Sequence, residues 1–206
     1  AMEENNLLNY ARAKELDLNV KKSKQMRFCL NRRPFCQCNH PNQNFETIQN
    51  AKILGIIFQA DCSFRKHCRQ LLAKLRRQMY IFKDLKLNNV GLNDIHSIFQ
   101  ALVISRIRYG LSVYGSDLHS LKKIDIFLEK CFQKKLCSSK ISVFELRKEE
   151  DHRHMMEILR NPTHPLYQYL TSFRKGRTTR HEFSNVRPYV RTSAFHQSFC
   201  NRVLSS

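Results

Sequence analysis

A chain of 206 residues can hold one sizeable domain, or a domain with a smaller appendage. Its hydrophobic fraction of 42% excludes wholesale disorder, because that many apolar side chains can build a core. The 36 Lys and Arg residues against 17 Asp and Glu give a formal net charge of +19, so we expect a polyanionic partner: a phosphate backbone first, an anionic membrane surface second.

The first part of the chain is expected to form a small α/β unit. Apolar residues at helical spacing predict a helix over residues 3–16, and short apolar runs predict strands over residues 25–30 and 52–58. Gly55 lies inside the second of these strands. Asp61 follows as the expected N-cap of a long helix, because its carboxylate can accept the unpaired backbone N–H groups of a first helical turn.

The long helix predicted over residues 62–87 has one apolar and one basic face. Offsets of three and four over about five turns define its apolar stripe: Phe64, Cys68, Leu71, Leu72, Leu75, Met79 and Phe82. The basic face beside it carries Arg65, Lys66, Arg69, Arg76, Arg77 and Lys83. A solvated helix face usually mixes signs, whereas Asp84 is the only acid after the cap. We therefore favour anion binding over an ordinary solvated surface for this face.

Three more amphipathic helices are expected after the basic helix. They cover residues 95–114, 118–136 and 142–159, and the turns between them are short. Asn93 or Asp94 is the expected N-cap of the first of the three. Consecutive amphipathic helices joined by short turns favour a small antiparallel bundle, so the expected fold class is α+β, mostly α.

The last segment, residues 171–206, is expected to be irregular, basic and rich in aromatic residues. Its cations are Arg174, Lys175, Arg177, Arg180, Arg187, Arg191 and Arg202, and they alternate with Phe173, Phe183, Tyr189, Phe195 and Phe199. Basic residues between aromatic ones suit a segment that follows a nucleic-acid strand, because phosphates meet the cations and bases stack on the rings. A flexible tail that is merely cationic is an equal alternative.

The cysteines and the lack of membrane signals bear on location. No stretch is apolar enough for a transmembrane span and the first residues are polar and acidic, so we expect an intracellular protein, in the nucleus, the cytoplasm or both, without a membrane partner. The eight cysteines should then be reduced.

Cys36, Cys38 and His40 could bind zinc with a distant fourth ligand such as His67. The C-x-x-C pairs typical of such sites are missing, so we expect no metal and keep zinc as the alternative.

Three segments carry short motifs in a fixed order along the chain. Residues 18–23 read Leu-Asn-Val-Lys-Lys-Ser, residues 52–56 read Lys-Ile-Leu-Gly-Ile with Asp61 and His67 after them, and residues 105–110 read Ser-Arg-Ile-Arg-Tyr-Gly with Tyr114 and Gly115 after them. In this order they resemble the C-terminal part of reverse transcriptases from non-LTR retrotransposons, of the LINE-like Jockey/CR1 type. They are similar to motif D of the palm, the K-x-L-G signature before the first thumb helix, and a Y-G-containing helix further into the thumb. Residues 183–199 resemble the basic closing segment of such proteins.

The resemblance implies four regions: the end of a palm-like α/β subdomain (1–60), a thumb-like helical bundle (61–140), an additional helix or connector (141–170) and a basic C-terminal segment (171–206). It also implies that Lys22 lies near the phosphates of the incoming nucleotide, and that Lys52 and Gly55 face the primer end. The basic helix would contact the backbone of a template–primer duplex, or RNA, without reading its sequence.

Polymerisation in that family is two-metal chemistry, in which carboxylates of an early palm strand and of an x-x-D-D hairpin hold Mg²⁺. This sequence has no Asp-Asp pair, and Glu149, Glu150 and Asp151 lie in a polar segment with no apolar strand beside them. The resemblance therefore implies a fragment of an RNA-directed DNA polymerase that begins after the catalytic residues, holds no cofactor and is inactive without the palm and fingers of the same polypeptide. The alternatives are a stand-alone basic nucleic-acid-binding module without enzymatic activity, and a zinc-dependent or membrane-surface protein.

Overall fold

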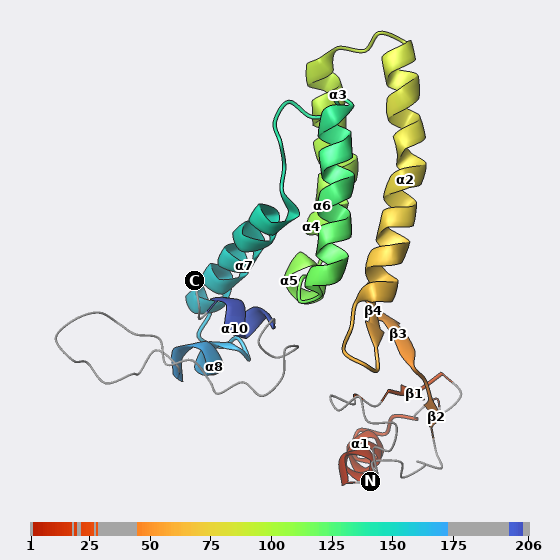
Figure 1. Cartoon of the computed structure of the whole chain (residues 1–206). Coiled ribbons are helices and arrows are strands. Elements are labelled where there is room, and N and C mark those ends of the chain that lie inside the picture. The colour runs from red at the N-terminus through yellow and green to blue at the C-terminus, as the bar shows by residue number, and fades with distance from the viewer. Residues whose placement is uncertain are drawn as a thin grey trace, which may run out of the picture. The chain divides into compact units, whose positions relative to one another are not determined.

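The computed structural model describes residues 2–17, 19, 22–26, 28, 45–172 and 198–203 (Figure 1). These residues form an α+β protein that is mostly helical, which confirms the predicted fold class. The chain divides into two compact units, Ala1–Cys62 and Ser63–Ser206. In the described part of the chain, no helix is both long enough and apolar enough to cross a bilayer.

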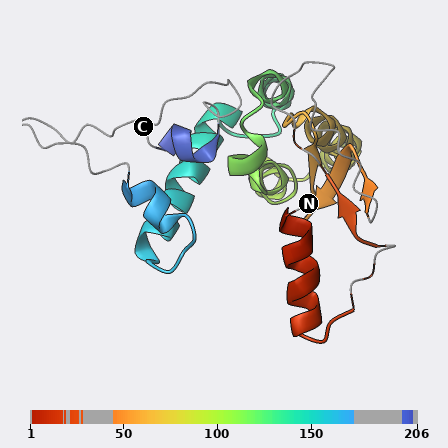
Figure 2. The same ribbon diagram turned by 90° about the horizontal axis from the view of Figure 1, so that it is seen from below.

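The first unit contains a helix and two small two-stranded sheets (Figures 1 and 2). Its elements are α1 (Met2–Ala13), β1 (Lys24–Gln25), β2 (Glu46–Thr47), β3 (Asn50–Ile53) and β4 (Ile56–Gln59). β1 and β2 pair in parallel, and an ion pair between Lys24 and Glu46 spans their ladder. α1 confirms the helix expected over residues 3–16. Of the strand expected over residues 25–30, only Gln25 lies in a strand among the described residues.

The prediction of a single strand over residues 52–58 is wrong, because the chain reverses direction in the middle of that run. β3 and β4 form an antiparallel hairpin in which Ile53 pairs with Ile56. The two residues between them, Leu54 and Gly55, have positive φ angles of 47° and 85°. Two positive φ angles are typical of the tight hairpin turn that matches the twist of the flanking strands. Gly55 therefore lies at a turn and not within a strand.

The second unit is helical. Its elements are α2 (Arg65–Leu87), α3 (Leu92–Phe99), the π-helical segment η1 (Gln100–Ile104), α4 (Ser105–Arg108), α5 (Leu111–Tyr114), α6 (Leu118–Gln133), α7 (Val143–Arg160), α8 (Tyr167–Ser172) and α10 (Phe199–Val203). α2 and α6 contact each other and run in the same direction, and the run from α3 to α4 lies antiparallel to both (Figure 1). Edge-to-face rings of Phe82 and Phe99, with 5.7 Å between centroids, join α2 to α3.

The apolar stripe of α2 is buried as its spacing predicts. The buried side chains of this helix are His67, Cys68, Leu71, Leu72, Leu75 and Phe82. Met79 is half-buried on the same side. Because the helix packs through this stripe, the charged residues between its members are left on the outside.

The predicted N-caps of the first two bundle helices are wrong. The N-cap of α2 is Phe64, with no side-chain hydrogen bond at the cap, so the helix begins further along the chain than a cap at Asp61 requires. The N-cap of α3 is Gly91, and Asn93 and Asp94 lie within its first turn. Asp94 still stabilises that end of the helix, because a negative side chain in the first turn complements the helix dipole.

The single helix predicted over residues 95–114 is interrupted near its end. Tyr109 leaves the helical conformation after α4, and Gly110 then adopts a left-handed φ of 70°. Glycine adopts this conformation at little cost, so it commonly ends helices. α5 begins anew after it, and the buried hydroxyl of Tyr114 donates a hydrogen bond to the carbonyl of Ile107 across the break.

The helices predicted over residues 118–136 and 142–159 are confirmed as α6 and α7. Asp117 caps α6 by accepting a hydrogen bond from the Ser120 amide at 3.2 Å. Ser142 caps α7 by accepting one from the Phe144 amide at 3.3 Å. These short polar residues satisfy N–H groups that the first turn of a helix leaves unpaired.

The C-terminal segment is not irregular throughout. α8 and α10 pack against α7 in a hydrophobic cluster built on Ile158, Leu170 and Val203. The prediction of an irregular segment over 171–206 is therefore wrong for its described ends, because α10 has apolar side chains to bury. The candidate contacts Arg174, Lys175, Arg177 and Arg180 lie outside the described residues.

Candidate nucleic-acid interface

The basic face of α2 is exposed to solvent. Arg69, Arg76 and Lys83 follow one another at seven-residue spacing, which places them on one flank of the helix two turns apart. All three are exposed, and none of them forms an ion pair with any acidic side chain in the described ranges. These three cations thus form a row of positive charge along one flank of α2.

The other predicted contacts on α2 are also on its outer side. Arg65 precedes Arg69 by four residues and extends the same flank, whereas Lys66 and Arg77 lie on the neighbouring row. All three are exposed. The Nε of Arg77 donates to the carbonyl of Ala73 at 3.4 Å, which holds this side chain along the helix surface.

A second cationic row comes from α6 and borders the first. The Met79 and Cys131 sulfur atoms meet at 3.7 Å where α2 packs on α6. Arg76 and Lys83 lie three residues before and four residues after Met79, so they flank this contact on α2. Lys134 lies three residues after Cys131, and its carbonyl accepts a hydrogen bond from the Lys86 ammonium. The ends of the two helices are thereby tied together.

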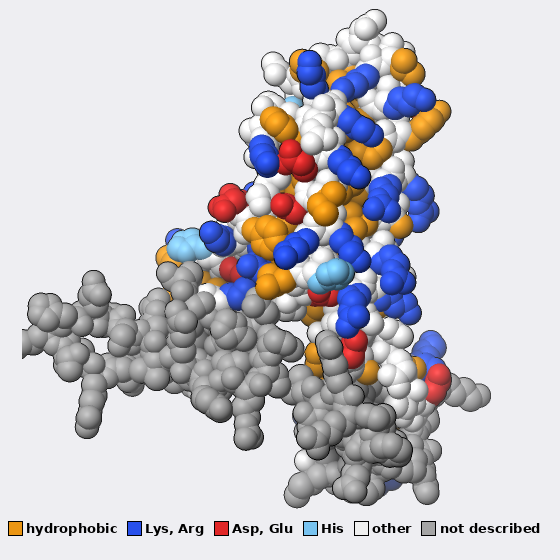
Figure 3. Space-filling view, in the orientation of Figure 1, with side chains coloured by type: hydrophobic (Ala, Val, Ile, Leu, Met, Phe, Trp, Pro, Cys, Tyr) orange, Lys and Arg blue, Asp and Glu red, His pale blue; other side chains and the backbone are white. Residues whose placement is uncertain are grey.

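Lys123, Lys130 and Lys134 line the α6 side of this contact. Lys123 lies four residues before the buried Phe127, and Lys130 and Lys134 lie three and seven residues after it; all three lysines are exposed. We call the combined surface the cationic seam, and its members are Arg69, Arg76, Lys83, Lys123, Lys130 and Lys134. Figure 3 shows Lys and Arg side chains gathered over α2 and the adjoining side of α6.

The acidic residues of α6 lie on its other flank and are used to build the fold. Asp125 accepts hydrogen bonds from the Ser142 hydroxyl at 3.1 Å and from the Val143 amide at 2.9 Å, at the start of α7. Glu129 pairs with Lys140 at 2.7 Å in the segment that leads to α7. Neither carboxylate neutralises the cationic seam, because both face the connection between α6 and α7.

The acidic patch on α7 is likewise paired inside the unit. Glu150 is buried and binds Arg108 at 2.8 Å and Arg153, while Glu149 binds Arg108 at 2.6 Å. Asp151 is buried and binds Arg202. With their oxygens engaged by arginine, these carboxylates do not offer a Mg²⁺ site, so we derive no metal-dependent step from them.

Arg202 is a structural residue, which corrects its grouping with the strand-following cations of the C-terminal segment. Its guanidinium is about nine-tenths buried and bonded to Asp151. A phosphate could bind it only by displacing a buried carboxylate, and separating such a pair is costly. The pairing was not visible in the sequence because Asp151 lies 51 residues away.

The remaining predicted site residues belong to the first unit. Lys22 is exposed in a turn, where its amide donates to the carbonyl of Asn19 at 3.0 Å and to the Asn19 side chain at 3.1 Å. Lys52 is exposed on β3, opposite Ile57. Gly55 lies at the hairpin turn, so the idea that it lets a primer approach a strand loses its structural basis.

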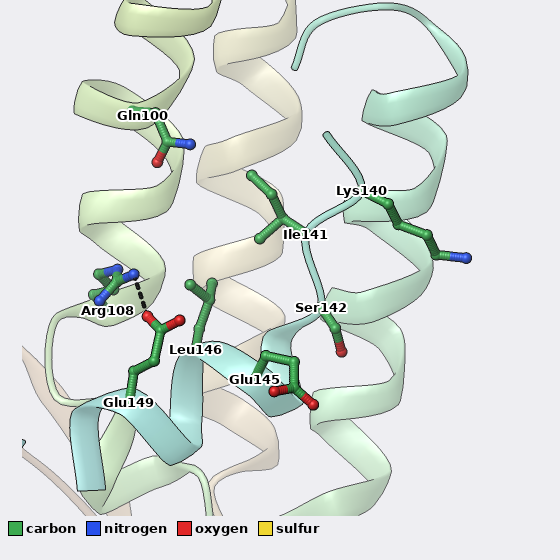
Figure 4. Close-up of a pocket in the computed structure, with 8 residues that line it drawn as sticks. All are labelled: Gln100, Arg108, Lys140, Ile141, Ser142, Glu145, Leu146 and Glu149. Atoms are coloured by element: carbon green, nitrogen blue, oxygen red, sulfur yellow. Dashed lines mark hydrogen bonds and ion pairs between the residues drawn. The ribbon is translucent and has the colours of Figure 1, made fainter. Parts of the chain in front are cut away.

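A pocket of about 430 Å³ lies between α4, the α6–α7 connection and α7 (Figure 4). Its lining residues are Gln100, Arg108, Lys140, Ile141, Ser142, Glu145, Leu146 and Glu149. The charged members have both signs, and Arg108 and Lys140 are bound to Glu149 and Glu129. A polyanion would meet carboxylates here, so this pocket is not a continuation of the cationic seam.

The zinc alternative rests on three residues of one short segment and a distant histidine. Cys36, Cys38 and His40 lie outside the described residues. His67, the fourth ligand considered, is buried with its ring 4.8 Å from that of Tyr114. Burial first, and then the charge of Lys74, lowers the pKa of His67 from its usual value. Among the described side chains, no group of three or more His, Cys, Asp or Glu residues is placed to hold a metal ion.

No family model matches this chain, and no curated protein or solved structure matches it either. The resemblance to non-LTR reverse transcriptases thus stays an interpretation of short motifs. What the chain does has to be inferred from the placement and charge of its own residues.

Proposed function

We propose that this chain binds the sugar-phosphate backbone of nucleic acid through the cationic seam, without reading its sequence. One observation carries the proposal. Six exposed cations, five on α2 and α6 and the sixth at the C-cap of α6, have no ion-pair partner among the described residues, while Glu129 of α6 and the acidic patch of α7 are paired with other cations. The repulsion between such cations falls when a polyanion lies against them.

The dimensions of the cationic seam suit a backbone better than a single phosphate. From Arg69 to Lys83 the α2 row covers fourteen residues, which is about 21 Å along the helix axis. Duplex DNA carries one phosphate charge per 1.7 Å of its axis, so this length spans about a dozen phosphate charges. A small anionic metabolite would leave most of the row without a partner.

The motif resemblance favours a particular form of this function: the thumb of a non-LTR reverse transcriptase, which holds the template–primer duplex of an RNA-directed DNA polymerase. What supports it is the order of the three motifs and the basic helix directly after the K-x-L-G-like segment. Two-metal chemistry would need carboxylates from other residues, because Glu149, Glu150 and Asp151 are engaged. A stand-alone binding module would use the same surface.

The proposal is tested by the salt dependence of binding to a short duplex. Replacing two α2 cations together (Arg69→Glu, Arg76→Glu) should weaken binding of every sequence alike. It should also reduce the slope of log K against log salt by about 1.8, since each lost phosphate contact removes about 0.9. The matched control carries the same charge change on α7 (Lys148→Glu, Arg160→Glu), where both residues are exposed.

The control should keep the wild-type slope, and circular dichroism should show the same helix content in all three proteins. An unchanged affinity and slope in the α2 variant would rule out the cationic seam as the contact surface. An equal loss of affinity in both variants would mean that binding depends on net charge and not on this surface.

A further inference from the structure

Tyr80 is an exposed aromatic residue in the middle of the basic face of α2. Its side chain is 68% exposed, whereas Phe82 on the same helix is fully buried. Residues three and four positions away are its neighbours on the helix surface. They are Arg76, Arg77, Lys83 and Asp84, so three of its four neighbours are cations.

The ring is left open on the α2 surface. In the described part of the chain, none of the aromatic or cation–ring contacts involves Tyr80. Long side chains on a helix lean toward its N-terminus, so the Tyr80 ring lies over the turn that carries Arg76 and Arg77. A flat apolar face therefore lies between Arg77 and two members of the cationic seam, Arg76 and Lys83.

Two ordinary explanations fit less well. A single exposed tyrosine needs no special account on its own, but three of the four helix-surface neighbours of this one are cations. An apolar protein surface would not suit it either, because docking there would desolvate Arg76, Arg77 and Lys83 without pairing them. A nucleotide satisfies both components, since it offers an aromatic base and an anionic phosphate in one unit.

We propose that Tyr80 is a stacking platform for an unpaired base of single-stranded nucleic acid, with Arg76, Arg77 and Lys83 contacting the phosphates on either side of that base. This inference rests on the proposed function and deepens it. A base inside a duplex cannot reach the ring, so the platform takes an unpaired base in a single strand or at a junction between single and double strand, whereas a duplex binds through the cations alone. Figure 3 shows hydrophobic side chains among the Lys and Arg side chains over this part of the unit.

The chain contains no tryptophan, which permits a direct test. Tyr80→Trp introduces a unique fluorophore at the platform, and Tyr109→Trp places one at another exposed tyrosine outside the cationic seam. Each variant is titrated with a single-stranded oligonucleotide and with an abasic strand of equal length. Stacking predicts that the oligonucleotide alone quenches the indole fluorescence of the Tyr80→Trp protein, and that neither strand quenches that of the Tyr109→Trp protein.

Affinity measurements on the full chain complete the test. Tyr80→Ala should weaken binding of the single strand by about 5- to 150-fold, which corresponds to about 1–3 kcal/mol per stacked base. It should leave binding of the duplex and of the abasic strand unchanged, and Tyr80→Phe should bind like wild type. Alanine favours helix, so α2 should stay folded.

Equal loss for the single strand and the abasic strand would overturn the stacking role, as would no loss for either. The proposed function has a separate readout, because duplex binding depends on Arg69 and Arg76 and not on Tyr80. If the Arg69→Glu, Arg76→Glu variant loses duplex binding while Tyr80→Ala binds every ligand normally, the platform fails and the backbone contact stands.

Discussion

Asp151 and Arg202 join α7 to α10 through two hydrogen bonds, from Nε to Oδ2 at 2.6 Å and from Nη2 to Oδ1 at 2.9 Å. The same guanidinium donates to the carbonyl of Ser112 at 2.8 Å, so it also holds α5. The side chains of Asp151 and Arg202 are 9% and 10% exposed, which keeps solvent from screening the pair. α10 is therefore fastened to α5 and α7.

This pair should matter greatly for stability. Asp151→Asn leaves a buried arginine without its counter-charge, so we expect the free energy of unfolding to fall by about 3–5 kcal/mol. Urea unfolding followed by circular dichroism measures the change. Glu145→Gln is the matched control, because the ion pair of Glu145 with Lys148 is exposed and 3.7 Å long, and should contribute less than about 1 kcal/mol. Equal effects of the two changes would contradict the assignment.

The β3–β4 turn predicts that substitutions at two adjacent positions change the stability of the hairpin in opposite directions. Leu54 holds a φ of 47°, which is unfavourable for leucine and favourable for asparagine, so Leu54→Asn should stabilise the hairpin by about 1 kcal/mol. Gly55 holds a φ of 85°, so Gly55→Ala should destabilise it by about 1 kcal/mol. Hydrogen exchange of the β3 and β4 amides reports both. Changes of the same sign would mean that the turn is formed differently.

The hairpin also shows where prediction from sequence stopped. The run 52–58 is apolar and β-branched, which indicates strand, but that pattern carries no information about a reversal. Leu-Gly is not among the dipeptides that mark such turns, so the only cue was a glycine inside a strand. α2 was predictable because its apolar positions repeat at offsets of three and four over about five turns. A repeat of that length fits an α-helix and not a strand.

The candidate site was predictable along one helix but not across two. Seven-residue spacing is enough to place Arg69, Arg76 and Lys83 on one flank of a helix. Lys123 and Lys130 have the same spacing, but the sequence does not say which helix packs beside α2. Arg202 resembles the other C-terminal cations in sequence, and only the fold brings its carboxylate partner to it.

The burial of His67 predicts a pH dependence of stability. Burial and Lys74 lower its pKa in the folded protein, so the unfolded chain binds the proton more readily. The stabilisation is therefore present above the unfolded pKa of about 6.5 and is lost as the pH falls through the folded value. His67→Phe removes this titration. The difference in unfolding free energy between wild type and variant should be constant near neutral pH and change in acid. If the two curves of unfolding free energy against pH stayed parallel in acid, a lowered pKa of His67 would be contradicted.

The lysines of α6 test whether the nucleic acid lies across both helices or along α2 alone. Lys123→Glu with Lys130→Glu should weaken duplex binding and lower the salt slope by about 1.8, as the α2 pair does, since each row contacts its own phosphates. Combining the four changes should lower the slope by about twice as much, because the contacts are separate. The Lys148→Glu, Arg160→Glu protein is again the control for net charge. If the α6 variant binds like that control, the backbone follows α2 alone, and Lys123 and Lys130 are solvated surface residues.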